Sequence, residues 1–438
     1  RTWQGDATQQ LKGMVLSRFF YSRQVHPLRD FSASFSGTAI VAAEYFTNLC
    51  FRGHLKEALE KFRSELCSDP QLFSCLLKGC IAAKSISLGR QLHALITTFG
   101  CSSDKFISNH LLNMYSKFGL QESVIALFGV MPRKNRMSCN ILIDGYIQNG
   151  DLEGARKVFN EMPDRNVPTW NAILTGLIGY EHEEEALSLF SEMYKSGFLP
   201  DEFTLGTILG GCAHLKVLME GCQIHAYVTK SGLEFDLVVG CSLAHMYMKS
   251  GRLEDGEAAI KAMPHQSVVA WNTLIVGKAQ NGFTQGALDH YRVMKMADFR
   301  PNDITFVSAV SSCSELATLG PGKQIHAEII KAGLTKIAPV ISSLVSMYSK
   351  CGCLDDSEQA FMEYGGVDLV LWTTMISAYG FHGRGEDAVE LFERMEMERL
   401  EANEVTFLSL LYACSHCGLK DKGVELFLFN GGEVWSEA

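Results

Sequence analysis

The chain has 438 residues, of which 47% are hydrophobic and 20% are charged, and its formal net charge is −10. This is a globular composition, and nowhere does a run of roughly eighteen apolar residues, the length of a membrane-spanning helix, occur. The negative charge excludes nucleic-acid binding by overall basicity, because phosphate binding depends on clustered Lys and Arg.

The N-terminal segment 1–38 has the composition of an organelle-targeting presequence. Its central stretch, Met14–Gly37, carries three arginines and five serines but a single acidic residue, Asp30. Such presequences are rich in Arg and Ser and poor in acids, and an ordinary disordered tail is the alternative. We expect residues 1–38 to direct the protein to an organelle, with the mitochondrion as the first choice and the chloroplast as the alternative.

From residue 39 onwards the sequence repeats itself. An interval of 101 residues separates the successive members of four sets of residues. The sets are Trp170, Trp271 and Trp372; Cys212, Cys313 and Cys414; Tyr146, Tyr247 and Tyr348; and His225 and His326. Because four residue types keep one register, the interval is a structural repeat.

Each interval divides into units of 35, 35 and 31 residues that open on similar sequences. Extended in both directions, the division gives about twelve units, with one extra short unit inserted. Their bounds are 39–69, 70–104, 105–135, 136–166, 167–201, 202–236, 237–267, 268–302, 303–337, 338–368, 369–403 and 404–438. We therefore expect residues 39–438 to form one continuous repeat array.

Each unit has the pattern of two short helices joined by a tight corner. In the unit 268–302, Trp271, Leu274 and Ile275 form an apolar stripe at helical spacing. Gly282 marks the corner before a second stripe. A single hairpin of this length cannot bury its apolar face, so neighbouring hairpins must pack on one another. The sequence predicts an all-α fold, a right-handed superhelical solenoid of helix-turn-helix repeats.

Three segments carry a family resemblance: GCQIHAYVTKSGL at 221–233, VAWNTLI at 269–275 and MYSKCGCLDDSEQAF at 347–361. They resemble the plant PLS class of pentatricopeptide repeat (PPR) proteins, in which long and short units alternate. Tetratricopeptide proteins, with uniform units of about 34 residues, do not match this rotation. Because the final FLFNGGEVWSEA departs from the pattern, we expect a chain without the complete E/DYW C-terminal extension of the class.

The resemblance implies that each unit contacts one base of a single-stranded RNA, selected by the fifth and last residues of the unit. An Asn amide offers a donor and an acceptor to a base edge, and a short hydroxyl leaves room for a purine. The implied RNA-binding pairs are Asn109 with Asn135 and Asn140 with Asn166 for pyrimidines, Asn171 with Asp201 for uracil, Asn272 with Asn302 leaning to cytosine, Ser342 with Asp368 for guanine, and Thr373 with Asn403 for adenine. Read from the unit 105–135, the implied target is 5′-YYUNNYNGAN, where Y is a pyrimidine.

The second residue of each unit is implied to stack between neighbouring bases. These residues are all apolar: Phe106, Met137, Pro168, Val238, Val269, Pro339 and Val370. Stacking is worth ~1–3 kcal/mol per base, so several well-read bases give useful affinity without a basic surface. The objection from net charge is thereby weakened.

Catalytic and metal chemistry find no support in the sequence. The His326–Glu328 triplet imitates the His-x-Glu of zinc deaminases, but the Pro-Cys-x-x-Cys segment that completes such a site does not occur. Cys414 and Cys417 form an isolated CxxC, and Cys414 shares its register with cysteines of other units, which favours buried residues over metal ligands. The fourteen cysteines favour a reducing compartment over a disulfide scaffold. We expect no enzyme, no metal and no cofactor, and we expect Trp170 and its equivalents to pack in the core.

The leading hypothesis is sequence-specific binding of single-stranded organellar RNA, with site recognition for C-to-U editing and a deaminase supplied by a partner protein. A splicing or RNA-stability factor would bind in the same way. A protein-binding scaffold is favoured by the acidic charge and opposed by the pattern of Asn and Thr. Neither DNA nor a membrane is an expected partner.

Overall fold

A computed structural model describes residues 70–132 and 134–430. The expected presequence and the first expected unit, 39–69, lie outside the described residues. Within the described ranges the chain forms helices α4 to α25 and two short 3-10 turns, and it contains no strand. None of these helices is both long and apolar enough to cross a bilayer.

The helices come in pairs, a first and a second helix joined by a short corner. The pairs are α4 (Pro70–Ala82) with α5 (Ile86–Thr98), α6 (Lys105–Lys117) with α7 (Gln121–Val130), α8 (Arg136–Gln148) with α9 (Leu152–Glu161), α10 (Val167–Gly179) with α11 (Glu183–Lys195), α12 (Glu202–Leu215) with α13 (Leu218–Ser231), α14 (Leu237–Lys249) with α15 (Leu253–Ala262), α16 (Val268–Gln280) with α17 (Thr284–Met296), α18 (Asp303–Glu315) with α19 (Leu319–Lys331), α20 (Ala338–Lys350) with α21 (Leu354–Tyr364), α22 (Leu369–Phe381) with α23 (Gly385–Met397), and α24 (Glu404–His416) with α25 (Lys420–Asn430). The turns η1 (Cys101–Ser103) and η2 (Leu233–Phe235) follow α5 and α13.

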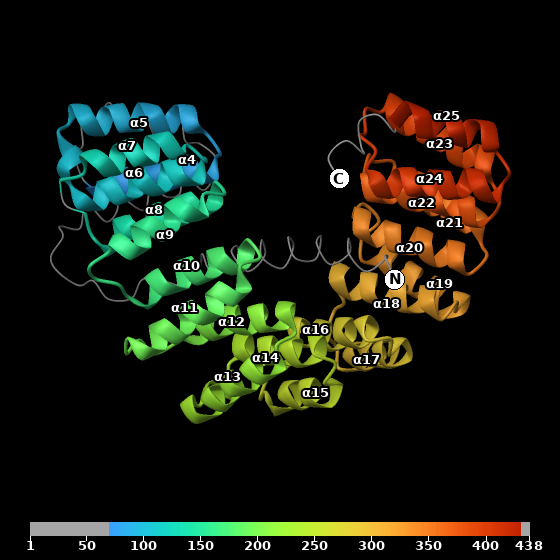
Figure 1. The fold of residues 1–438 in the computed structure, drawn as a ribbon, viewed down its shortest axis with the longest axis horizontal. Coiled ribbons are helices and arrows are strands. Elements are labelled where there is room, and N and C mark those ends of the chain that lie inside the picture. Colours follow the sequence, from blue (N-terminus) through green and yellow to red (C-terminus); the bar gives the residue numbers. More distant parts are fainter. Residues whose placement is uncertain (1–69, 133, 431–438) are drawn as a thin grey trace. The chain divides into compact units, whose positions relative to one another are not determined.

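The chain divides into two compact parts, Arg1–Gly211 and Cys212–Ala438. In the first part, the first helices α4, α6, α8 and α10 lie side by side in that order, and each second helix packs on its own first helix (Figure 1). In the second part, α14, α16, α18, α20, α22 and α24 form a row of the same kind. Each part is therefore a stack of hairpins whose first helices form one layer, as the all-α prediction requires.

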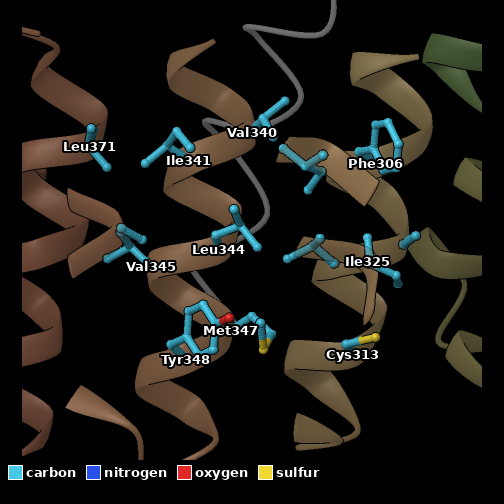
Figure 2. Packing of buried hydrophobic residues seen from close by; sticks show 14 of the residues in the cluster. Phe306, Cys313, Ile325, Val340, Ile341, Leu344, Val345, Met347, Tyr348 and Leu371 are labelled. Atoms are coloured by element: carbon cyan, nitrogen blue, oxygen red, sulfur yellow. The ribbon is translucent and has the colours of Figure 1, made fainter. Parts of the chain in front are cut away.

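Helix α20 shows how the core forms between hairpins (Figure 2). Leu344 and Met347 point toward the α18–α19 hairpin, whereas Ile341 and Val345 point toward Leu371 of α22. All five side chains are at most 2% exposed. Because neighbours cover both faces of a first helix, its apolar positions extend around much of its circumference, and their burial is the main stabilising term.

The repeated tryptophans belong to this core. Trp170 is fully buried, and its ring meets Phe159 edge to face at a centroid distance of 4.9 Å. Trp372 packs on Phe361 in the same way at 5.4 Å, and Trp271 is also buried. The prediction that these rings pack in the core is confirmed.

The corners between the two helices of a pair need a left-handed backbone. Gly282, the corner residue expected from the sequence, has a φ of +80°. Glu181 takes the corner of the α10–α11 pair with a φ of +64°, and Lys216 and Ala317 also have positive φ at their corners. The hairpin geometry imposes this conformation, so a side chain with a Cβ at the corner carries backbone strain.

Candidate nucleic-acid interface

Each expected reading pair spans the junction between two consecutive hairpins. The fifth residue lies in a first helix, as Asn171 does in α10, and the last residue directly precedes the next first helix, as Asp201 precedes α12. The start of a helix leaves backbone N–H groups without partners, and the side chain of the last residue accepts one of them. The last residue is therefore the N-cap of the next helix as well as a candidate reader.

The junction of Asn171, Asp201 and Thr204 is a closed hydrogen-bond network. Asp201 Oδ1 accepts the backbone N–H of Thr204 at 2.8 Å and Nδ2 of Asn171 at 3.1 Å. The Thr204 hydroxyl lies 2.5 Å from Asn171 Oδ1 and 2.7 Å from Asp201 Oδ1. Both polar atoms of the Asn171 amide are held, so its orientation is fixed.

The junction of Asn272, Asn302 and Thr305 repeats this network. Asn302 Oδ1 accepts the backbone N–H of Thr305 at 3.1 Å and Nδ2 of Asn272 at 3.0 Å. The Thr305 hydroxyl donates to Asn272 Oδ1 at 2.6 Å. Here the fifth residue and the last residue are again joined directly.

Two further junctions keep the bond from threonine to the fifth residue. The Thr169 hydroxyl donates to Asn140 Oδ1 at 2.8 Å. The hydroxyls of Thr373 and Thr406 lie 2.7 Å apart, and Thr406 also donates to Asn403 Oδ1 at 2.9 Å. In all four networks the threonine is the third residue of the following unit.

The junction of Asn109, Asn135 and Ser138 is different. Ser138 caps the helix start together with Asn135, and its hydroxyl donates to the Asn135 backbone oxygen at 2.8 Å. Asn109 Oδ1 is buried and has no hydrogen-bond partner. The two expected readers are present, but no hydroxyl links them.

The junction of Ser342 and Asp368 is also open. Asp368 Oδ1 accepts the backbone N–H of Leu371 at 2.9 Å, and the buried Oγ of Ser342 has no partner. The third residue of the next unit is leucine, which offers no hydroxyl. Cys241 is the fifth residue of a unit to which the sequence assigned no base. The third residue of the next unit is Ala270, so this junction also lacks a hydroxyl.

At four of the six expected pairs the fifth residue is buried and its partner is more exposed, whereas Asn109 and Asn140 are partly exposed like their partners. Asn171 and Asn272 are each 7% exposed, whereas Asp201 and Asn302 are partly exposed. The helix that begins at the last residue covers the fifth residue of the unit before it. A base would therefore reach such a pair mainly through the last residue, an asymmetry that the sequence did not indicate.

The seven expected stacking residues lie in the first turn of their first helices. Phe106, Met137, Pro168, Val269 and Val370 are exposed, and Val238 and Pro339 are partly exposed. Exposed apolar groups at a regular spacing suit flat apolar ligands such as base faces.

His110 follows Asn109 in α6 and is a strongly perturbed titratable group beside an expected reader. Its ring meets Phe106 edge to face at 4.6 Å. Burial, together with the nearby charge of Lys78, lowers the pKa of His110 to about 4. The imidazole is therefore neutral at physiological pH.

Three histidines at equivalent positions of second helices pack between helices. Each donates or accepts one hydrogen bond of 2.8 Å between its Nδ1 and a tyrosine hydroxyl of the next first helix. The pairs are His93 with Tyr115, His225 with Tyr247, and His326 with Tyr348. Glu328 accepts the Tyr291 hydroxyl at 2.7 Å. His326 and Glu328 thus have protein partners, and the described residues contain no cluster of three potential metal ligands.

Sequence reasoning missed the junction threonines. Thr169, Thr204, Thr305 and Thr406 each occupy the third position of a unit, and a comparison of units by register would have shown them. Their bonding was not visible, because each contacts a residue about thirty positions earlier in the chain.

This fold defines a helical-repeat protein. Six of the junctions between its consecutive hairpins carry a pair of expected reading residues. The model of the PPR repeat family matches residues 134–169, 165–214 and 367–416, and that of the PPR repeat matches 269–299. The chain belongs to the pentatricopeptide repeat family, as its sequence relatives also indicate.

Two relatives from Arabidopsis thaliana illustrate the similarity. Pentatricopeptide repeat-containing protein At2g41080 is 55% identical over 369 residues, which cover 84% of this chain and 57% of the relative. The chloroplastic pentatricopeptide repeat-containing protein CRR2 is 32% identical over 90% of this chain and 56% of its own length. The chain thus spans about half the length of these relatives.

Among solved structures, the chain is similar to PPR10, a pentatricopeptide repeat protein from maize, in complex with an 18-nt psaJ RNA element. The TM-score is 0.70 at 19% identity, over 89% of this chain and 59% of the other. This likeness concerns the fold, and it confirms the predicted solenoid of helical repeats.

Proposed function

We propose that this chain binds single-stranded RNA in a sequence-specific way, one base per unit, through the pairs at its junctions. The observation that carries the proposal is the network of Asn171, Asp201 and Thr204, which fixes the orientation of the Asn171 amide and leaves Asp201 partly exposed. The similarity to PPR10, whose solved complex contains RNA, supports it.

Capping decides which atoms of the last residue remain for a base. Capping and the Thr204 hydroxyl both use Asp201 Oδ1, which leaves Oδ2 as the freer acceptor. Uracil carries an N–H donor at N3 of its Watson–Crick edge, so it complements a carboxylate oxygen. This supports uracil at the pair of Asn171 and Asp201.

Asn302 presents the opposite polarity. Its Oδ1 accepts both the backbone N–H of Thr305 and Nδ2 of Asn272, so the group left over is the Nδ2 amine, a donor. Cytosine has an acceptor at N3, which this amine complements. The two junctions differ by one residue at the last position, and the difference supports cytosine at the second.

The remaining readers complete the proposed target 5′-YYUNNYNGAN. In this proposal Asn109 with Asn135 and Asn140 with Asn166 read pyrimidines, Ser342 with Asp368 reads guanine, and Thr373 with Asn403 reads adenine. The exposed or partly exposed residues Phe106, Met137, Pro168, Val238, Val269, Pro339 and Val370 stack on the bases. Stacking of ~1–3 kcal/mol per base makes binding feasible in an acidic chain.

We further propose that the chain is a PLS-class protein of an organelle, with units bounded as given above and a presequence in residues 1–38. Relatives that are named chloroplastic and mitochondrial support an organelle without selecting one. In this proposal the bound RNA is a site of C-to-U editing, and the deaminase is a separate protein.

The direct test is a binding titration of the full chain with the proposed ten-base RNA, a shuffled RNA of equal composition, and the DNA version of the target. We expect tight binding to the first alone. Equal affinity for the target and the shuffled RNA would remove the assigned readers, and failure to bind any RNA would favour a protein-binding scaffold.

The biological role needs a second measurement. RNA that copurifies with the tagged protein from organelles would be sequenced in plants with and without the protein. Loss of C-to-U conversion beside the bound segment supports editing, whereas unchanged conversion with altered transcript level or splicing supports the alternative roles.

A further inference from the structure

The four junction threonines share an environment that the remaining junctions lack. Each of them is fully buried. Each hydroxyl bonds to the fifth residue of the preceding unit at 2.5–2.8 Å. They are Thr169, Thr204, Thr305 and Thr406. Where Ser138 or Leu371 takes this position, the polar atom of the fifth residue has no partner.

The orientation of an Asn side chain decides what it offers a base. The terminal torsion of Asn is broad and nearly two-fold, so the amide turns over easily when nothing holds it. Turning over exchanges Oδ1 and Nδ2, and thereby exchanges the acceptor and the donor that a base meets. A reader without a fixed orientation therefore tolerates bases of opposite polarity.

The junction threonine removes this freedom at Asn171. Its hydroxyl faces Asn171 Oδ1, while the carboxylate of Asp201 faces Asn171 Nδ2. A flipped amide would place an oxygen against the carboxylate and lose both favourable contacts. The backbone N–H of Thr204 simultaneously holds Asp201, so one residue sets both members of the pair.

Threonine suits this task better than serine because its second Cβ substituent restricts χ1. In the open junction the Ser138 hydroxyl turns to the backbone oxygen of Asn135 instead of the reader. Such local bonding to the backbone is an alternative that short hydroxyl side chains adopt readily. The methyl group of threonine therefore favours a bond from the hydroxyl to the fifth residue over a bond to the backbone.

We propose that the threonine at the third position of the following unit is a positioning residue for base selection, which fixes the reading edge of the unit before it. This inference rests on the proposed function and adds a third side chain to each reading pair. Junctions with threonine discriminate more sharply between bases than junctions with Ser138 or Leu371.

The test compares the affinity of the full chain for the proposed RNA and for the same RNA with cytosine at its third base. Thr204→Val removes the hydroxyl and keeps the shape, and Thr204→Ser keeps the hydroxyl. One net hydrogen bond corresponds to about a threefold to tenfold change. We expect Thr204→Val to lower the preference for uracil by that factor. Thr204→Ser should lower it by less, because its hydroxyl is present but, without the methyl group, turns more easily to the backbone.

A matched control is Thr273→Val, which removes a partly exposed hydroxyl bonded only to the backbone oxygen of Val269. It should leave the preference at the third base unchanged. A purely structural role for Thr204 would weaken binding to both RNAs equally. A folded Thr204→Val chain with the original preference would overturn the inference, whereas an unaltered chain that prefers no base would overturn the proposed function instead.

Ser138→Thr keeps the inference testable if Thr204→Val does not fold. The new hydroxyl should bond to Asn109 Oδ1 and raise the preference for a pyrimidine over a purine at the first base by about threefold or more. An unchanged preference in this folded variant would contradict the inference.

Discussion

Two junctions in the first part of the chain contain almost the same side chains and differ in their bonding. Asn171 is held by Thr204 and by its partner Asp201. Asn109 has an Oδ1 atom without a partner, although Asn135 caps the next helix as Asp201 does. The reading pair is therefore not a property of the fifth and last residues alone.

The difference shows that capping the next helix and fixing the fifth residue are separable. A side-chain acceptor stabilises the start of a helix, as Asp201 and Asn302 do, so a polar last residue already has a role in the fold itself. The additional bond from the hydroxyl of the third residue exists only where threonine is present. A network that is fully satisfied fixes one arrangement of donors and acceptors, and an open one does not.

The largest expected effect comes from exchanging the last residue of the closed junction. Asp201→Asn still caps the helix but replaces an acceptor by a donor at the third base. Because a hydrogen bond to a charged group contributes about 1.5–3 kcal/mol, we expect the preference to move from uracil to cytosine by about tenfold or more. Titration with the two RNAs measures it.

Asn302→Asp should produce the reciprocal change at the sixth base. If a folded Asp201→Asn chain kept its preference for uracil, the residue that caps the helix would not be the residue that selects the base.

Acidification should lower the stability of the fold through His110, which lies beside Asn109. Its pKa of about 4 lies below the ordinary value of 6.5, so the unfolded chain takes up the proton first. The stabilising effect of the neutral imidazole is complete above pH 6.5 and is lost as the pH falls toward 4. We expect the free energy of unfolding to fall by on the order of 1 kcal/mol from this group between neutral pH and the middle of that window.

Urea unfolding of the original chain and of His110→Gln at several pH values measures this contribution. The substitution should flatten the pH dependence irrespective of its own effect on stability. If the free energy of unfolding depended on pH in the same way in both chains, His110 would not be the group responsible.

Closing the open junction should also stabilise the fold. Ser138→Thr gives Asn109 Oδ1 a donor, and satisfying a buried acceptor is worth about 0.5–1.5 kcal/mol. The midpoint of urea unfolding should rise with an unchanged slope. Ser138→Ala serves as the control and should lower the midpoint, since it removes a capping hydroxyl.

The smallest effect is expected at the corner of the hairpin that carries Asn171. Glu181 has a φ of +64°, and glycine relieves this strain at the expense of a more flexible unfolded chain. Glu181→Gly should stabilise the chain by about 0.5 kcal/mol, and base preference should not change. A decrease in thermal stability would show that the side chain of Glu181 contributes more than its backbone costs.

The sequence by itself determined the repeat, its helical hairpins and the buried tryptophans. These features follow from local spacing: apolar residues at helical intervals, and rare residues such as Trp170, Trp271 and Trp372 at one register. It also indicated the candidate readers, but only through a family resemblance.

Only the tertiary structure decided how those readers are held. Thr204 and Asn171 are far apart in sequence and meet because two first helices lie side by side. It also revealed that Asp201 is a helix cap and that Asn171 is mostly buried. The cap is a local contact, but the burial of Asn171 and its bond to Thr204 are not encoded in local spacing, because contacts between helices depend on the distance and angle at which complete hairpins pack.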